Sequence, residues 1–539
     1  MRITELLIIS LVLFGLAYRF YSPWIAKRLG LDPGRPTPAH TMPDGVDYCP
    51  ARAPVLFGHH FASIAGAAPI VGPIAAAAYG WLPVLLWIIF GGIFLGAVHD
   101  FATLMASIRH SGRSMGEVIS KYVGWTGGKI FLVFLWATLV LLIACYLAVV
   151  SKTFAAEPPA GTSSVLFIFL ALLFGLTIYR LKAPLGVSTF VGVAALAACI
   201  VLGWYYPIVL SPFWWTVLLL IYIYAASVAP VWILLQPRDF LNSFLLYALV
   251  AAALVGYLLA RPAIELPAFV AFTDAKLGPL FPILFVTVAC GAISGFHSVV
   301  SAGTTAKQLG REEDARPIGF GAMIVESLVA VLALFAAMML TREQYGVSLS
   351  SQGPVALFSN SIGSLLSTVG IPAEKGTTFA ALAVSAFILT TLDTATRLCR
   401  FALQELFTPK AGGRPPLVTR NRYIATLFTV APAAALAYSG HWETIWPIFG
   451  SANQLLAALA LLAVALWLRH SKRKTAFLGF PMVAMFLITL SALGLIAYRD
   501  SMRGNYALGS VAMVLFVLAV TLMIEAVRSL RREYGRSPA

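Results

Sequence analysis

Ionisable side chains inside otherwise apolar stretches are the residues of this sequence most capable of chemistry. A charged group is costly in lipid, so such residues usually face a cavity or a partner. Histidine titrates near neutral pH, so histidines beside carboxylates can relay protons, and clustered histidines can also bind a metal ion. Proton relay, metal binding and a structural role all stay open here. The candidates for ion or proton coupling in this group are His59, His60, His99, Asp100, His297, Glu326 and Asp393.

Two of these carboxylates differ in their surroundings. Glu326 stands alone well inside its apolar stretch, which makes it the best single candidate for a carboxylate that takes up and releases a proton. A hydrogen bond to a buried hydroxyl or amide is the alternative role for Glu326. Asp393 precedes Arg397 by one helical turn, so the two can pair on one face, and we expect that pair to be structural.

Glycine and proline interrupt two apolar stretches. Proline removes a backbone donor and clashes with the preceding turn, and the freed backbone groups survive at membrane depth only within protein or beside a cavity. Helix-end amides at such breaks can receive a carboxylate. We therefore predict that the two breaks form the substrate site. Its residues are Gly66, Ala67, Pro69 and Gly72 from the first break, and Ser227, Pro230 and Trp232 from the second.

A third apolar stretch, residues 290–298, reads CGAISGFHS. Its small residues allow close helix approach, and its hydroxyls and freed carbonyls can bind a cation or pass a proton. Ser294, His297 and Ser298 are therefore coupling candidates, although plain close packing explains the same pattern. Asn453 adds a polar position on a later stretch, with no assigned use.

Composition requires lipid as the solvent for much of the chain. Hydrophobic residues make up 60% of the 539 residues and charged residues only 11%. The apolar runs are ~20 residues long, as membrane helices require, whereas barrel strands need only ~10. The predicted fold is an all-α polytopic membrane protein with about fifteen transmembrane helices. The predicted spans are 3–21, 58–78, 81–108, 127–150, 163–181, 187–206, 213–234, 240–260, 279–300, 317–340, 376–400, 419–439, 445–468, 476–498 and 507–528.

Lysine and arginine fall mostly in every second segment between these spans. Cytoplasmic loops retain basic residues, so we predict a multi-pass membrane protein with its N-terminus outside and its C-terminus in the cytoplasm. The formal net charge of +15 is spread over the cytoplasmic loops. This distribution favours anionic membrane lipid as a partner and argues against nucleic acid.

The order of the spans suggests an inverted repeat. Five spans begin at the first break and five more, of opposite direction, begin at the second, so the first helix of each half is broken. We predict a 5+5 inverted-repeat core on this basis. The predicted divisions are an extra N-terminal helix at 1–21, a Pro-rich cytoplasmic segment at 22–57, repeats at 58–206 and 213–400, four further helices at 419–528 and a basic tail at 529–539.

Several motifs resemble one known family. RLGLDPGRPTPAHTMPDGVDY, VLFGHHFASIAGAAPIVGP, GAVHDF, SVAPVWILLQPRDFLN, GAISGFHS, TTLDTATRL and WPIFGSANQLLAA together resemble the carbon-starvation protein A family, over about residues 20–470. The resemblance implies nutrient uptake across the inner membrane in starvation, with peptides or pyruvate as substrates. It also implies kinship to the amino acid–polyamine–organocation transporters, which have a 5+5 inverted repeat.

The predicted function is secondary active import of a small carboxylate-bearing nutrient, peptide or pyruvate, with protons or another cation. No cofactor is expected, because the sequence contains no ATP-binding motif, nucleophile elbow or HExxH site. A membrane-embedded enzyme that depends on a metal or on the histidines is one alternative, and a starvation receptor is another. The substrate, the coupling ion and any metal binding by the histidines stay undetermined.

Overall fold

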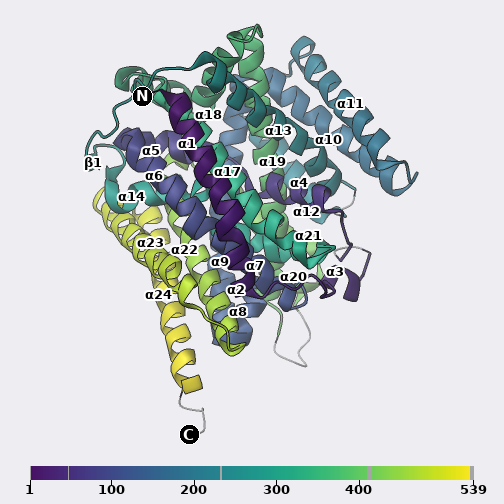
Figure 1. Ribbon diagram of the computed structural model, residues 1–539, viewed down its shortest axis with the longest axis vertical. Helices are drawn as coiled ribbons and strands as arrows, with labels where there is room; N and C mark the ends of the chain where they lie inside the picture. The colour runs from purple at the N-terminus through teal and green to yellow at the C-terminus, as the bar shows by residue number, and fades with distance from the viewer. Residues whose placement is uncertain (1, 46–47, 231–232, 410–415, 535–539) are drawn as a thin grey trace.

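The computed structural model describes residues 2–45, 48–230, 233–409 and 416–534, which are mostly helical and pack into one bundle (Figure 1). Two short strands, β1 (Thr273–Asp274) and β2 (Gly278–Pro279), pair antiparallel in the described part of the chain. The all-helical fold follows from the apolar composition, because a helix satisfies its own backbone hydrogen bonds in lipid.

The first half of the chain contributes thirteen of the described α-helices. They are α1 (Ile3–Leu16), α2 (Ser22–Leu29), α3 (Pro38–Thr41), α4 (Ala53–Ile64), α5 (Ala68–Ala76), α6 (Trp81–Gly91), α7 (Ala97–Arg109), α8 (Met115–Val123), α9 (Trp125–Ala156), α10 (Pro158–Tyr179), α11 (Leu185–Tyr205), α12 (Pro212–Val228) and α13 (Leu235–Ala260).

The second half contains the remaining described α-helices, after the β1–β2 hairpin. They are α14 (Leu280–Val288), α15 (Gly295–Val300), α16 (Ala306–Gln308), α17 (Ala322–Met338), α18 (Arg342–Ser367), α19 (Ala373–Leu406), α20 (Leu417–Arg420), α21 (Arg422–Tyr438), α22 (Trp442–His470), α23 (Ala476–Met502) and α24 (Tyr506–Tyr534). Short 3-10 and π segments join or extend some of them: η1 (Ala17–Tyr21), η2 (Ala77–Tyr79), η3 (Gly92–Gly96), η4 (Ala289–Gly291), η5 (Ser301–Thr305), η6 (Glu312–Asp314) and η7 (Arg316–Gly321).

The predicted polytopic membrane protein is confirmed at the level of its helices. Within the described ranges, 12 helical stretches are long and apolar enough to cross a membrane, and the bent pair α4–α5 makes 13. The predicted spans 213–234 and 419–439 correspond to α12 and α21, each 17 residues long. These two are shorter than a typical membrane helix, so the total of about fifteen stays a prediction.

Burial separates a central set of helices from a rim. The most apolar stretches of α19, of α22 and of the unit from α14 to α16 are 94% buried within the protein. The corresponding stretch of α11 is only 11% buried, and α10 and α11 stand together at one edge of the bundle (Figure 1). Ionisable side chains are costly on the rim helices, because these face lipid, so the central helices are where such side chains are expected.

Two segments differ from the sequence expectation. The first membrane helix continues without a loop through η1 and α2 to Leu29, so the Pro-rich connection is shorter than the predicted 22–57. That connection packs on the bundle, because the backbone of Ala51 pairs with Leu309 and the Asp32 N–H donates to Glu312 Oε1 at 2.8 Å. Residues 341–375, which lie between two predicted spans, are largely α18, which bends at Gly353, where the backbone has φ 82°.

Candidate functional site

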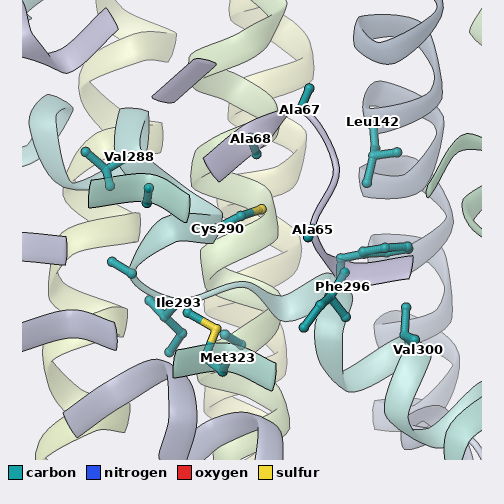
Figure 2. Close-up of a cluster of buried hydrophobic side chains, with 14 of the residues drawn as sticks. Ala65, Ala67, Ala68, Leu142, Val288, Cys290, Ile293, Phe296, Val300 and Met323 are labelled. Carbon is teal, nitrogen blue, oxygen red and sulfur yellow. The ribbon is translucent and has the colours of Figure 1, made fainter. Parts of the chain in front are cut away.

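Two broken helices meet at the centre of the bundle. The first break joins α4 to α5 at Ala65–Ala67 with a bend of 43°, at the position predicted from glycine and proline. The second interrupts the unit of α14, η4 and α15, where Ala289 has φ 31° and Ser294 is extended. Figure 2 shows both breaks in one view, with Cys290 close to the coil between Ala65 and Ala67.

Gly72 and Gly66 allow the first break to fit among its neighbours. A Cβ on Gly72 would lie 2.5 Å from the Thr287 carbonyl oxygen, which belongs to the second broken helix. A Cβ on Gly66 would lie 2.8 Å from Thr391 Oγ1 and 2.9 Å from the Tyr146 hydroxyl. These distances are below van der Waals contact, so glycine is required for the close approach. The walls of the break are therefore α9, α14 and α19.

The two helix N-termini at the breaks have different partners. At α15, Asn453 Oδ1 accepts the Phe296 N–H at 2.8 Å, so a side chain already caps this end. Helix α5 begins at Ala68 with Pro69, which has no N–H, in its first turn, and the Tyr146 hydroxyl makes a hydrogen bond with the backbone of Ala68. The partial positive charge of a helix N-terminus favours an anion there. The α5 end therefore presents a hydroxyl that can donate to a carboxylate, whereas the α15 end is bound by an amide oxygen.

Four buried ionisable side chains form a chain next to the second break, where α15 carries His297. Asp100 lies between two histidines, with Oδ1 2.7 Å from His99 Nδ1 and Oδ2 2.7 Å from His297 Nδ1. The other ring nitrogen of His297, Nε2, is 3.2 Å from Glu326 Oε2. Glu326 therefore does not stand alone, contrary to the sequence expectation. We call His99, Asp100, His297 and Glu326 the histidine–carboxylate chain.

Cys290 adds a sulfur to this region. Asn453 Nδ2 donates to Cys290 Sγ at 3.4 Å and to Ser294 Oγ at 3.0 Å, so the predicted Ser294 joins the same polar group. Cys290, His297 and Glu326 each offer one ligand atom, and these atoms lie within 4.8 Å of one another. They are the group in the described residues where a metal ion would find three ligands. Ser298 instead donates to the Gly295 carbonyl oxygen at 2.6 Å.

A second buried network is organised around Arg238. Its guanidinium group donates to Asp393 and to the Tyr222 hydroxyl, and it lies 3.1 Å from Asp239 Oδ1. The other Asp239 oxygen, Oδ2, is 2.9 Å from His59 Nδ1, which belongs to α4. Asp393 therefore makes its ion pair with Arg238 from α13. We call Arg238, Asp239, Asp393, His59 and Tyr222 the arginine network.

His60 points elsewhere than its neighbour His59. Its Nδ1 lies 2.8 Å from Thr305 Oγ1, which belongs to the π segment after α15. Adjacent residues on a helix point ~100° apart, which is why the two histidines have partners on different helices. His60 thus ties α4 to the second broken helix, and His59 ties α4 to α13.

The second predicted break lies away from the first. Helix α12 ends at Val228, and Ala229 is extended, so this interruption separates α12 from α13 and does not divide one span. Ser227 Oγ lies 3.3 Å from Thr426 Oγ1 of α21, and the freed carbonyls of Ala226 and Ala229 accept from Arg397. Pro230 follows this extended turn, and Trp232 lies outside the described residues. The structure thus brings the 66–72 break against residues 287–294, whereas the prediction paired it with 227–232.

Several site residues are absent from the sequence prediction. Tyr146 and Thr391 line the first break, and Thr391 Oγ1 donates to the Ser63 carbonyl oxygen at 3.1 Å. Tyr146 sits in an apolar stretch of α9, where nothing in the local pattern marks it, whereas Thr391 lies in the polar motif TTLDTATRL, two residues before the predicted Asp393. Arg238 and Asp239 carry a signal, because two charges stand at the start of an apolar stretch, but the alternation of basic loops assigns Arg238 to a connection.

Two cavities lie toward opposite ends of α9 and α19. The α18 cavity, of about 520 Å³, is lined by α9, α18, α19 and the start of α22, and its lining includes Lys152, Glu157 and Trp442. The α8 cavity, of about 350 Å³, lies beside α8 and its lining includes Lys307 and Glu405. Figure 1 shows α18 at the end of the bundle that carries the N-terminus and α8 near the opposite end. Along α9 and α19, Tyr146 and Thr391 fall between these two cavities.

Sequence comparison with known proteins identifies one family and several named transporters as relatives. The family model described as "Carbon starvation protein CstA" matches residues 3–351 and 346–492. The "Peptide transporter CstA" of Escherichia coli (strain K12) is 35% identical, with 90% of this chain and 80% of that protein covered. The "Peptide transporter CstA" of Bacillus subtilis (strain 168) is 32% identical, with 98% and 97% covered. The "Pyruvate/proton symporter BtsT" of Escherichia coli (strain K12) is 32% identical, with 94% and 83% covered.

Solved structures share the fold at low sequence identity. Two structures of a manganese transporter of Eremococcus coleocola align with TM-scores of 0.56 and 0.52, at 10% and 12% identity. Each alignment covers 91% of this chain and 99% of the transporter. At this identity the likeness concerns the arrangement of helices and carries no information on the ligand.

Proposed function

Because the chain belongs to the carbon starvation protein CstA family, we propose that it is a secondary active transporter that imports a small carboxylate-bearing nutrient with protons. It is a multi-pass protein of the inner membrane, and its relatives are named as transporters, not as enzymes. The substrate classes we propose are those in the relatives' names, peptides and pyruvate, with a role in carbon starvation taken from the family name.

We place the substrate carboxylate at the N-terminus of α5. Gly66, Ala67, Pro69 and Gly72 of the predicted site surround this end. The Tyr146 hydroxyl, which lies beside Gly66 and the backbone of Ala68, can donate to this carboxylate, and the positive end of α5 favours an anion. The support for this placement is the chemistry of the two caps, because the α15 end binds the Asn453 amide oxygen, which cannot donate to a carboxylate.

The observation that carries proton coupling is the position of His297 between two carboxylates. A neutral imidazole has one N–H, so it can donate either to Asp100 or to Glu326, and the other nitrogen then presents a lone pair to a carboxylate. One added proton, on His297 or on Glu326, makes both contacts favourable. A buried group that needs one proton to complete its hydrogen bonds is a suitable carrier for symport.

We propose a 5+5 inverted repeat with different members from those expected from the sequence. Helices α12 and α21 both pack on α9 and α19. Helix α13 packs on the broken helix α4 and on α19, and in the same way α22 packs on the broken helix α15 and on α9. These matched contacts assign α4–α5, α6–α7, α9, α12 and α13 to one repeat, and α14–α16, α17, α19, α21 and α22 to the other. The pair α10–α11 is then an insertion at the rim, and about fifteen spans result.

The orientation remains the one expected from the basic loops. We propose that the α8 end, near which the basic segments gather, faces the cytoplasm and anionic lipid, and that the α18 end and the N-terminus face outside. The two cavities would then be the cytoplasmic and external approaches to the breaks. Alternating access would occlude one while opening the other.

Glu326→Gln in proteoliposomes tests the coupling. Glutamine mimics a protonated carboxyl that cannot release its proton, so we expect driven accumulation of pyruvate or alanyl-alanine to fall at least tenfold. Exchange of labelled for unlabelled substrate without a pH gradient should persist, which also reports folding. The control is Glu343→Gln, because Glu343 is exposed on α18. Unchanged pH-driven accumulation in Glu326→Gln would remove the coupling assignment.

Metal analysis of the purified protein tests the other occupant of the same group. If a proton completes the contacts of His297 and Glu326, uptake is indifferent to EDTA and metal content stays well below one ion per chain. One zinc-class ion per chain, lost in Cys290→Ser, would assign the group to a metal and contradict the proton assignment.

A further inference from the structure

An ammonium group and a carboxylate, both without ion-pair partners in the described residues, line the α18 cavity. Lys152 Nζ lies 5.2 Å from the centre of the Trp442 ring, and Glu157 Oε2 accepts from Thr378 Oγ1 at 3.3 Å. Within the part of the chain that the structure describes, neither charge has an ion-pair partner. The other carboxylate of the lining, Glu443, is paired with Lys276 at 3.1 Å. The cavity therefore offers one ammonium group and one carboxylate to a ligand.

The position of these two charges sets the size of the ligand. Lys152 lies in the last turns of α9 and Glu157 caps its C-terminus, so they are offset by about 7.5 Å along the helix axis. The termini of an extended dipeptide are about 7 Å apart. The cavity of about 520 Å³ lies within the range of pockets that bind organic ligands. Burial raises the pKa of the Glu157 carboxyl, so a cationic group beside it would stabilise the charged form.

We propose that the α18 cavity is an outer binding site for zwitterions with separated charges, for which a dipeptide is the simplest ligand. The ligand carboxylate pairs with Lys152, which Trp442 holds in place through a cation–π contact, and the ligand ammonium group pairs with Glu157. This inference rests on the proposed transport function and narrows it. A monocarboxylate has no cation for Glu157, so the site favours short peptides over pyruvate.

The test measures binding of L-alanyl-L-alanine to the purified full-length protein in nanodiscs. Its N-acetylated form, which has no ammonium group, should bind the wild type about tenfold more weakly, as expected for loss of one charge-assisted contact of ~1.4 kcal/mol. This comparison needs no variant. Equal binding of the two ligands, or no binding of L-alanyl-L-alanine, overturns the proposal.

Variants locate the site. Lys152→Met and Glu157→Gln should each weaken L-alanyl-L-alanine binding about tenfold, and Glu157→Gln should no longer distinguish the N-acetylated ligand. The matched control is Lys375→Met, which removes an exposed cation near the start of α19 that does not line the cavity. Wild-type binding in both cavity variants, with unchanged gel-filtration profiles, overturns the proposal.

The same protein distinguishes failure of this inference from failure of the transport function. If pyruvate accumulates in proteoliposomes but L-alanyl-L-alanine does not bind, the outer site is wrong and transport stands. If the dipeptide binds with the expected charge dependence but nothing accumulates, the site stands and secondary transport is wrong.

Discussion

The histidine–carboxylate chain and the arginine network are both buried and polar, yet they differ in their charges. The arginine network contains a permanent cation, Arg238, which donates to Asp393 and lies beside Asp239. The histidine–carboxylate chain contains no permanent cation, only groups that gain or lose a proton. Guanidinium stays charged at any physiological pH, so the arginine network keeps a fixed positive charge. The histidine–carboxylate chain has no such fixed charge, so a single added proton changes the charge of the whole group.

The location of the two groups follows the same division. The arginine network joins α4, α12, α13 and α19, and His59 is its one member on a broken helix. The histidine–carboxylate chain joins α7, α15 and α17, and α15 is the helix that begins at the second break. The comparison teaches that a buried ionisable residue is informative about function only together with its partner. The fixed pair holds helices together, and the conditional one is suited to couple to a substrate.

The largest expected effect is loss of stability in Arg238→Met. Removing the guanidinium group leaves Asp393 and Asp239 buried without their cation, which costs about 3–5 kcal/mol when one partner of a buried pair is removed. Thermal unfolding in detergent, followed by gel filtration, measures it. The control is Arg342→Met, an exposed arginine at the start of α18, which should unfold like the wild type. Wild-type stability in Arg238→Met would show that the network is not structural.

A smaller loss is expected in the double variant Arg238→Met with Asp393→Asn. Asparagine removes one of the two carboxylates that lack a cation, so the double variant should be more stable than Arg238→Met alone by about 0.5–3 kcal/mol. The same unfolding measurement on the four proteins of the cycle gives the coupling energy. Additive losses would mean that Arg238 and Asp393 do not act as a pair.

The smallest effect on stability is expected in Glu326→Gln. Glu326 Oε2 lies 3.2 Å from His297 Nε2, and a glutamine keeps an oxygen or nitrogen beside this ring while it removes the cost of burying a charge. We therefore expect its unfolding free energy to change by less than about 1 kcal/mol, although driven uptake is lost. Glu326→Gln should therefore lose driven uptake while it keeps its stability, whereas Arg238→Met should lose stability. A loss of stability as large as that of Arg238→Met would erase the distinction between the two regions.

The helices and one break follow directly from local sequence. Each helix needs a continuous apolar run, and Pro69 sets a helix start at α5, just after the break at Ala65–Ala67, wherever the rest of the chain lies. The break at residues 289–294 has no proline, so it is legible only as a run of small residues. The structure locates this break, because it shows Gly72 of α5 packed against the Thr287 carbonyl just before residue 289. The repeats that we propose differ from the predicted ones for a related reason, since the apolar pattern of a rim pair of helices is the same as that of a core pair.

The sequence by itself determined that the chain spans a membrane. It also determined where the pair α4–α5 breaks and which ionisable residues lie within apolar stretches. It could do so because the cost of polar groups in lipid acts on each segment separately. Only the tertiary structure decided that Glu326 faces His297, that Arg238 binds Asp393 and that the second break lies at residues 289–294. These partners are distant in the chain. Which face of one helix contacts which face of another is set by the packing of the whole bundle, and local sequence does not record that packing.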